Sequence, residues 1–202
     1  MTSTSVNETV IDFLDFSHEN EMSILNLVGP IWSLSSLEIQ DQFYIAFACS
    51  SSQETPKERH LILERNEHAN CIPIVTYKRD EKPVMYMCIG HEKGTVWDVK
   101  WMEKRKEDDI GELLVCCDNG DIDIYAIPCT TSPEKTYVEP IFHASLERGK
   151  VLAMAISPYI SSQFLAGDSM GRITLWDSRD TEMNPRRPIK TFMNRKFKCN
   201  IC

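Results

Sequence analysis

The chain has 202 residues and a mass of 23.2 kDa, with 42% hydrophobic and 26% charged residues and a formal net charge of −8. This length suits one large domain or two small ones, and the composition excludes a mainly disordered, collagen-like or coiled-coil protein. Because the excess of acidic residues repels a phosphate backbone, we expect protein partners rather than autonomous binding to nucleic acid.

Membrane insertion and secretion are not expected. The longest apolar run, 43–49, is far shorter than the roughly 18–20 residues that a membrane helix needs. Near the N-terminus, Glu8 and Asp12 interrupt the apolar segment that a signal peptide requires. Four of the eight cysteines lie in hydrophobic runs, where a free thiol behaves as a small apolar side chain, so a reducing compartment fits best. They are Cys49, Cys88, Cys116 and Cys117.

Short apolar or alternating stretches bounded by turn residues recur along the chain, which is typical of β-strands. Helical spacing of apolar residues is hard to find beyond about the first 30 residues, so the sequence predicts an all-β fold. The predicted strands are 31–38, 42–50, 60–64, 71–78, 83–89, 96–102, 112–117, 122–127, 151–157, 163–166 and 172–177, followed by an outer strand at 188–192.

Two links between these strands are predicted to be tight hairpin turns. One contains Asn119 and Gly120, and the other contains Met170 and Gly171. Glycine supplies the positive φ that such turns require, and Asn-Gly is the stronger of the two signals.

The order of these features repeats. Gly90 and His91 precede a strand, a second strand, the Asn-Gly hairpin and a third strand that ends at Tyr125. The same order follows His143 and ends at Trp176, and the two landmarks are offset by 52 and 51 residues. A third, weaker copy lies upstream, where Trp32 stands 65 residues before Trp97.

The Gly-His pair, the strand with Val96, Val99 and Trp101, and the terminal Trp-Asp pair resemble WD40 repeats. That family builds four-stranded propeller blades from repeats of about 40–45 residues. The resemblance implies a partial WD40-type β-propeller of about three four-stranded blades. The repeat positions that it implies are Trp32, His91, Trp97, Trp101, Tyr125, His143, Trp176 and Asp177.

WD40 blades often contain a buried hydrogen-bonded set formed by a His, a strand Ser or Thr, a turn Asp and the Trp. The resemblance places His91 and His143 in the first position of this set. The turn Asp should stand about six residues before the Trp, where the chain has Asn119 and Met170. The nearest acids lie one or two positions earlier, so no complete set is expected. Both histidines can equally be packed loop residues with single hydrogen bonds.

The chain divides into an N-terminal segment, 1–28, which could belong to an outer strand, three blades and a basic tail, 193–202. The predicted blades are 29–89, 90–142 and 143–192. Closed propellers typically have about four to eight blades, so three blades cannot close a ring alone. Because both end blades would keep a bare apolar face, the chain is expected to self-associate or to need a partner.

Two segments, Gly29–Leu34 and His91–Trp101, are similar to motifs that open blades in the WD40 subunit of the general transcription factor TFIIIC. The Cys-Pro pair that often follows the second motif is replaced by Met102 and Glu103. This resemblance implies a nuclear scaffold in RNA polymerase III transcription. Its partners would be other protein subunits, and it would meet DNA mainly through the complex. The alternative is a generic WD40 adaptor in a ubiquitin-ligase, trafficking or chromatin complex.

No catalytic, cofactor or metal site is predicted. The chain contains no nucleophile elbow, zinc-protease motif, P-loop or dinucleotide-binding fingerprint. Cys199 and Cys202 have the spacing of half a zinc site, but no second pair completes four ligands. Asp121 and Asp123 alternate along one strand and are expected at an exposed edge. A small β enzyme, the remaining alternative, would need a pocket with converging polar groups and a small-molecule substrate, and neither is expected.

The end of the chain is basic and is the expected place for weak contact with nucleic acid or for a nuclear import signal. The alternative is a solvated last strand followed by a frayed terminus. The residues assigned to a nucleic-acid contact are Arg186, Arg187, Lys196 and Lys198.

The two tryptophans of the second motif are expected to differ in burial. Strand alternation predicts that Trp97, Val99 and Trp101 share one face while Asp98 and Lys100 point the other way. On that face, Trp101 is expected in the core and Trp97 at a partly exposed position.

Overall fold

The computed structural model describes residues 15–19, 22–27, 29–50, 70–79, 81–129, 138–146, 148–179 and 187–193. Every regular element within these ranges is a β-strand, which confirms the all-β prediction. Among the residues described, no helix has the length and apolar character needed to cross a membrane.

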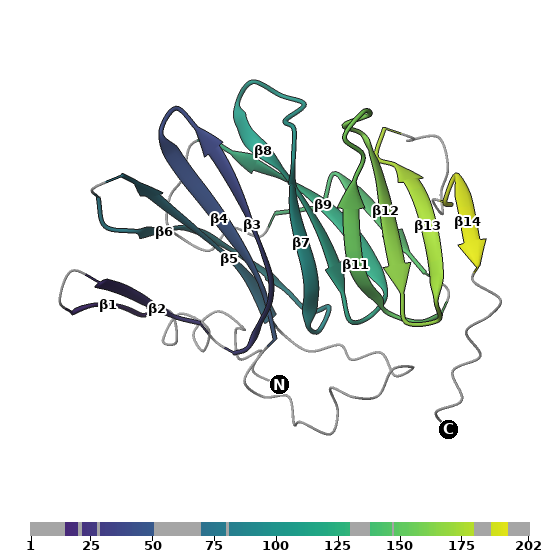
Figure 1. Ribbon diagram of the computed structural model, residues 1–202, viewed down its shortest axis with the longest axis horizontal. Coiled ribbons are helices and arrows are strands. Elements are labelled where there is room, and N and C mark those ends of the chain that lie inside the picture. Colours follow the sequence, from purple (N-terminus) through teal and green to yellow (C-terminus); the bar gives the residue numbers. More distant parts are fainter. Residues whose placement is uncertain are drawn as a thin grey trace, which may run out of the picture.

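Twelve of the described strands form three four-stranded antiparallel sheets, and in each sheet the strands are paired in chain order. The sheets stand side by side in chain order, in a propeller-like arrangement, and we call them blades 1, 2 and 3 (Figure 1). Blade 1 contains β3 (Ile31–Ile39), β4 (Gln42–Cys49), β5 (Asn70–Lys78) and β6 (Val84–His91). Blade 2 contains β7 (Val96–Met102), β8 (Asp109–Cys117), β9 (Asp121–Pro128) and β10 (Phe142–Ser145). Blade 3 contains β11 (Val151–Ile156), β12 (Gln163–Asp168), β13 (Arg172–Asp177) and β14 (Lys190–Met193).

The structural blades and the sequence-based ranges differ at their boundaries. His91 ends β6 and His143 lies in β10, so both histidines belong to the outermost strand of the preceding blade rather than to a loop. Within the N-terminal segment, β1 (Asp15–Glu19) and β2 (Met22–Asn26) pair as a separate hairpin. The predicted strand at 60–64 lies outside the described residues.

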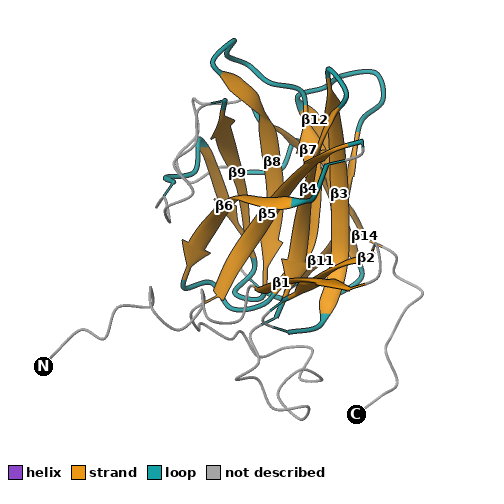
Figure 2. Ribbon diagram, turned by 90° about the vertical axis from the view of Figure 1, so that its left-hand side faces the viewer, coloured by secondary structure: helices purple, strands orange, loops and turns teal. Residues whose placement is uncertain are grey.

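The strand ends and their connecting turns gather at two opposite ends of the molecule (Figure 2). We call the end at which β3, β7 and β11 begin the starting end. Gly120 and Gly171 have φ of 87° and 76° and lie between paired strands, which confirms both predicted hairpin turns. The β3–β4 turn uses Gln40 and Asp41 at positive φ, as a two-residue hairpin loop of this type requires.

The first strand of each blade, which we call its inner strand, has a β-bulge close to its start; these strands are β3, β7 and β11. The pairing register shifts between Ile31 and Ser33, between Val96 and Asp98, and between Val151 and Ala153. The extra residues are Trp32, Trp97 and Leu152, which shows that the three blades repeat in structural detail. A bulge turns the residues after it to the other face of the strand. The prediction that Trp97 shares one face of its strand with Trp101 was therefore wrong, because the two side chains pack against different hydrophobic clusters on opposite sides of blade 2.

Two apolar layers fill the spaces between neighbouring blades. The layer between blades 1 and 2 contains Ile74, Val99 and Trp101, and the layer between blades 2 and 3 contains Leu114 and Trp176. Blade 2 is buried on both faces because it has a neighbour on each side. The predicted burial of Trp101 is confirmed, since only 8% of this residue is exposed.

Three buried cysteines of blades 1 and 2 behave as apolar side chains: Cys49, Cys116 and Cys117. Cys116 and Cys117 are adjacent in β8 and point into the layers on opposite faces of blade 2, as alternation predicts. Burial, assisted by the nearby Cys88, raises the pKa of the Cys49 thiol to about 12, so this thiol stays protonated at neutral pH.

Asp98 connects the inner strands of all three blades. Its side chain accepts hydrogen bonds from the Ser33 hydroxyl in β3 and, at 2.8 Å, from the Met154 backbone N–H in β11. Lys100 neutralises its charge from the same strand. Asp98 is therefore buried and links the blades, and it is not a solvent-exposed residue of its strand.

Candidate functional site

Residues from the three bulges form an exposed apolar row at the starting end. The row consists of Trp32, Trp97 and Leu152, one from the inner strand of each blade. The rings of Trp32 and Trp97 lie 4.9 Å apart between centroids and are tilted by 48°. Trp32 and Leu152 are 44% and 42% exposed, and Trp97 is half-buried. We call this feature the bulge row.

A buried ion pair supports the bulge row from below. The Trp97 indole N–H donates to Asp118 at 2.8 Å, and the same carboxylate oxygen lies 2.7 Å from the Lys150 ammonium. Lys150 also lies 6.0 Å from the centre of the Trp97 ring. Because the Asp118 and Lys150 side chains are only 1% and 3% exposed, this group joins blade 2 to the segment that leads into blade 3. Asp118 stands near the repeat positions in the sequence, but its pairing with Lys150 was not predicted.

Asp168, the acid that precedes the turn of blade 3, stands one position earlier than Asp118 does in blade 2, since it pairs with Val151 as Cys117 pairs with Val96. It also has a different role. Its carboxylate accepts hydrogen bonds from the backbone N–H groups of Met170 and Arg172, both at 2.9 Å. The Arg172 side chain adds an ion pair at 2.6 Å. Asp168 therefore closes its own hairpin turn, whereas the Trp176 indole donates to Thr174.

A second polar group lies in blade 2, around the carboxylate of Asp123. This carboxylate is fully buried, with the His143 Nδ1 atom at 2.8 Å and the Lys93 ammonium at 2.6 Å. The Tyr125 hydroxyl donates to it at 3.2 Å, and Lys93 also reaches Asp121 at 3.4 Å. We call these five residues the Asp123 cluster. The expectation that Asp121 and Asp123 form an exposed edge was wrong, because blade 1 covers this side of blade 2.

The protonation states in the Asp123 cluster follow from its geometry. Burial alone would raise the pKa of Asp123, but the hydrogen bond from His143 and the charge of Lys93 lower it below its ordinary value. The same hydrogen bond raises the pKa of His143 against the opposing effect of burial. Burial and the nearby carboxylate raise the pKa of Tyr125, so its hydroxyl keeps its proton at neutral pH.

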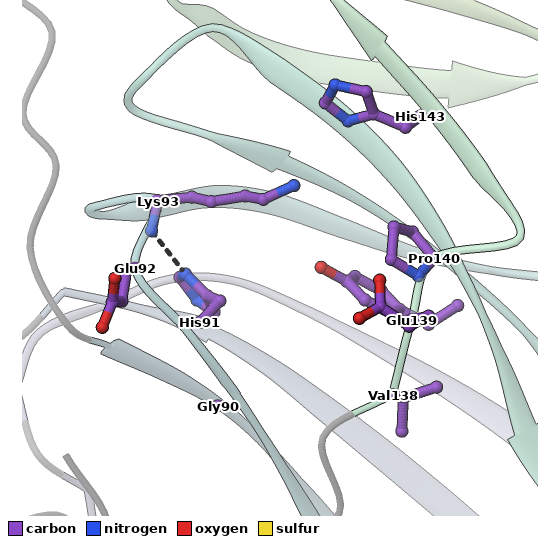
Figure 3. A pocket seen from close by; sticks show the side chains of 9 residues that line it. Gly90, His91, Glu92, Lys93, Val138, Glu139, Pro140 and His143 are labelled. Atoms are coloured by element: carbon purple, nitrogen blue, oxygen red, sulfur yellow. Dashed lines mark hydrogen bonds between the residues drawn. The ribbon is translucent and has the colours of Figure 1, made fainter. Parts of the chain in front are cut away.

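The Asp123 cluster borders a pocket of about 630 Å³. Residues Gly90–Lys93 and the segment from Val138 to His143 face each other across it (Figure 3). Oxygens of Asp121 and Asp123 and a ring nitrogen of His143 lie within 4.8 Å of one another, which is close enough to hold a metal ion. However, the Lys93 ammonium already lies between the carboxylates as their counter-ion. The arrangement therefore suits a structural link between strands better than a metal site or an acid–base site.

The remaining predicted positions are spread over the blades. The backbone N–H of Lys93 donates to the Nδ1 of buried His91 at 3.2 Å. The Trp176 indole N–H donates to the Thr174 hydroxyl at 2.7 Å, and the Tyr125 hydroxyl likewise donates to Asp123, two residues before it. Asp177 accepts from the Arg179 backbone N–H at 3.0 Å. The structure thus links the aromatic residue of the third strand to its own strand, and not to a turn Asp.

Little of the basic C-terminal region falls within the described residues. Arg187 is exposed, and the Lys190 ammonium lies 5.0 Å from the centre of the Phe192 ring. The other predicted contacts, Arg186, Lys196 and Lys198, lie outside the described residues, as do Cys199 and Cys202. The prediction of weak nucleic-acid contact therefore stays a prediction.

The Asp123–His143 pair predicts a pH dependence of stability. Because the pKa of His143 is raised in the folded state, its contribution is complete below the ordinary histidine pKa and is lost as pH rises through the folded value. We expect His143→Gln to lower the free energy of unfolding more at about pH 5.5 than at about pH 8.5. Urea unfolding of both proteins at the two pH values measures this. An equal loss at both values would contradict the assigned pairing.

The chain matches no model of a known protein family, and a search of curated proteins finds no match either. Function is therefore inferred from the residues and from their geometry.

Proposed function

We propose that this protein is an interaction scaffold, the WD40 subunit of a TFIIIC-like complex that acts in RNA polymerase III transcription. In this role it works in the nucleus and contributes a rigid docking surface for other subunits at tRNA and 5S gene promoters. Most phosphate contacts come from those subunits, because a chain of net charge −8 attracts DNA poorly.

The observation that carries this proposal is the bulge row. Trp32 and Trp97 each belong to one of the two segments that resemble the TFIIIC subunit, and their rings pack against each other at equivalent bulges of neighbouring strands. Exposed tryptophan and leucine side chains placed on rigid strands are typical of protein-docking surfaces, where aromatic residues supply much of the binding energy. The buried Asp118–Lys150 pair below the row keeps it in place.

Affinity purification from a nuclear extract tests this proposal. The tagged chain should recover TFIIIC subunits, and the double variant Trp32→Ser, Leu152→Ser should recover at least about tenfold less of them. Tyr159→Ser is the matched control, since Tyr159 is 93% exposed and lies in the turn between β11 and β12, at the opposite end of the molecule. Circular dichroism of each variant checks that the strand content is unchanged.

Two results would count against this assignment. Recovery of only a ubiquitin-ligase, coat or chromatin complex would favour the generic adaptor. Equal recovery by the double variant and the wild-type chain would show that the bulge row is not the docking surface.

A further inference from the structure

Each junction between blades joins two kinds of sheet face. We call the face of a blade that packs against the preceding blade its leading face, and the face that packs against the following blade its trailing face. In blade 2, Val99, Trp101 and Val115 belong to the leading face, whereas Leu114 and Cys116 belong to the trailing face. Blade 2 therefore shows both faces in their packed state.

The trailing face of blade 3 is not covered by any part of the chain that the structure describes. Cross-strand pairing places Leu165, Ile173 and Phe192 on this face, because their neighbours Phe164, Ala166 and Trp176 point into the layer toward blade 2. Leu165, Ile173 and Phe192 are 39%, 47% and 44% exposed. Ala153 and Ala155 of the inner strand share this face and are also exposed, so another inner strand can approach closely.

Among the residues that the structure describes, none covers the leading face of blade 1. The bulge aligns Leu34 of β3 with Val99 of β7, and β4 alternates so that Phe43, Ile45 and Phe47 lie on the same face as Leu34. Leu34 is 57% exposed, and the three β4 residues are half-buried. Leu34 of blade 1 thus occupies the place that Val99 of blade 2 fills inside a packed junction.

We propose that a second copy of this chain covers both faces, with the trailing face of blade 3 in each copy packed on the leading face of blade 1 in the other. A second copy is the partner that fits, because the chain already packs a trailing face on a leading face at both of its own junctions. Each copy also offers one exposed face of each kind. A two-fold axis forms both new junctions at once and gives a closed ring of six blades, within the usual range for propellers. This inference goes beyond the proposed function and does not depend on it.

Measurements of molar mass by light scattering test the closure. The full chain, measured from about 1 to about 100 µM, should reach a plateau at twice its 23.2 kDa mass. A monomer throughout this range would overturn the proposal. So would a mass that keeps rising with concentration, because a head-to-tail contact that does not close produces open chains.

Single-face variants distinguish head-to-tail closure from a face that pairs with itself. Leu34→Lys and Ile173→Lys each place a charge on one exposed face and should each raise the dimer dissociation constant by roughly 100-fold, since every junction uses both faces. An equimolar mixture of the two variants keeps one intact junction and should associate more than either variant alone. Tyr159→Lys, outside both faces, should remain a dimer. If only one of the two face variants dissociates, the head-to-tail arrangement is wrong.

Discussion

Replacing Trp101 with alanine is expected to lower the free energy of unfolding by about 3–5 kcal/mol, the usual cost of truncating a large core aromatic. Trp101 lies between blades 1 and 2, among Leu37, Val99 and Leu113, and is 8% exposed. Its ring also sits against Gly111, where a Cβ atom would approach within 3.1 Å, so neighbouring residues are already close-packed. Urea unfolding followed by circular dichroism, at one fixed protein concentration, measures the loss.

Trp32→Ala is the matched control for this prediction. The same atoms are removed, but Trp32 is 44% exposed and mainly loses its tilted ring contact with Trp97. We expect a cost of about 1 kcal/mol, the usual size of an aromatic pair interaction. Similar small losses for Trp32→Ala and Trp101→Ala would show that the register of the inner strands is wrong.

The architecture was accessible from sequence because its signals are local. Alternation and turn chemistry predicted each described strand of the three blades except β10, and the Asn119–Gly120 turn has the positive φ that its glycine indicates. β10 was missed because it has only four residues and because His143 was interpreted as a loop position, whereas β14, which is equally short, was predicted as the outer strand that completes the third blade. A strand this short carries too few alternating positions to distinguish it from a loop.

The bulges were not accessible from sequence in the same way. The residue that a bulge inserts is defined by its pairing with the next strand, so a single strand gives no signal of it. Alternation therefore placed Trp97 on the same face as Trp101, although the two side chains enter different layers. The equivalent positions of Trp32 and Trp97 in two copies of the repeat were the only available indication that these residues share a special geometry.

The Asp123 cluster was missed for a related reason. In sequence, Asp121 and Asp123 alternate with isoleucines, which is typical of a strand with one solvated face. Blade 2 is instead covered on both sides, and Asp123 is neutralised by Lys93 and His143, which lie 30 and 20 residues away in the chain. A middle position among three repeats was the one signal that both faces of this strand would be buried.

Breaking the buried ion pair between Asp118 and Lys150 is expected to be as costly as truncating Trp101. Lys150→Met leaves the Asp118 carboxylate buried beside the Trp97 indole without its counter-ion, and Asp118→Asn leaves the Lys150 ammonium without its carboxylate. Each single variant should lose about 3–5 kcal/mol of unfolding free energy, because an uncompensated charge stays in a site that water reaches poorly. Chemical unfolding of each variant, under the conditions used for Trp101→Ala, measures these losses.

The double variant Asp118→Asn, Lys150→Met separates the ion pair from its surroundings. The amide oxygen introduced by Asp118→Asn can still accept the Trp97 hydrogen bond, and a methionine side chain fills much of the volume of the lysine, so the double variant should be more stable than either single variant. Glu107→Gln is the control, because it breaks the exposed Lys104–Glu107 pair and should cost less than about 1 kcal/mol. Additive losses in the double variant, or single losses as small as that of the control, would mean that Asp118 and Lys150 do not act as one buried unit.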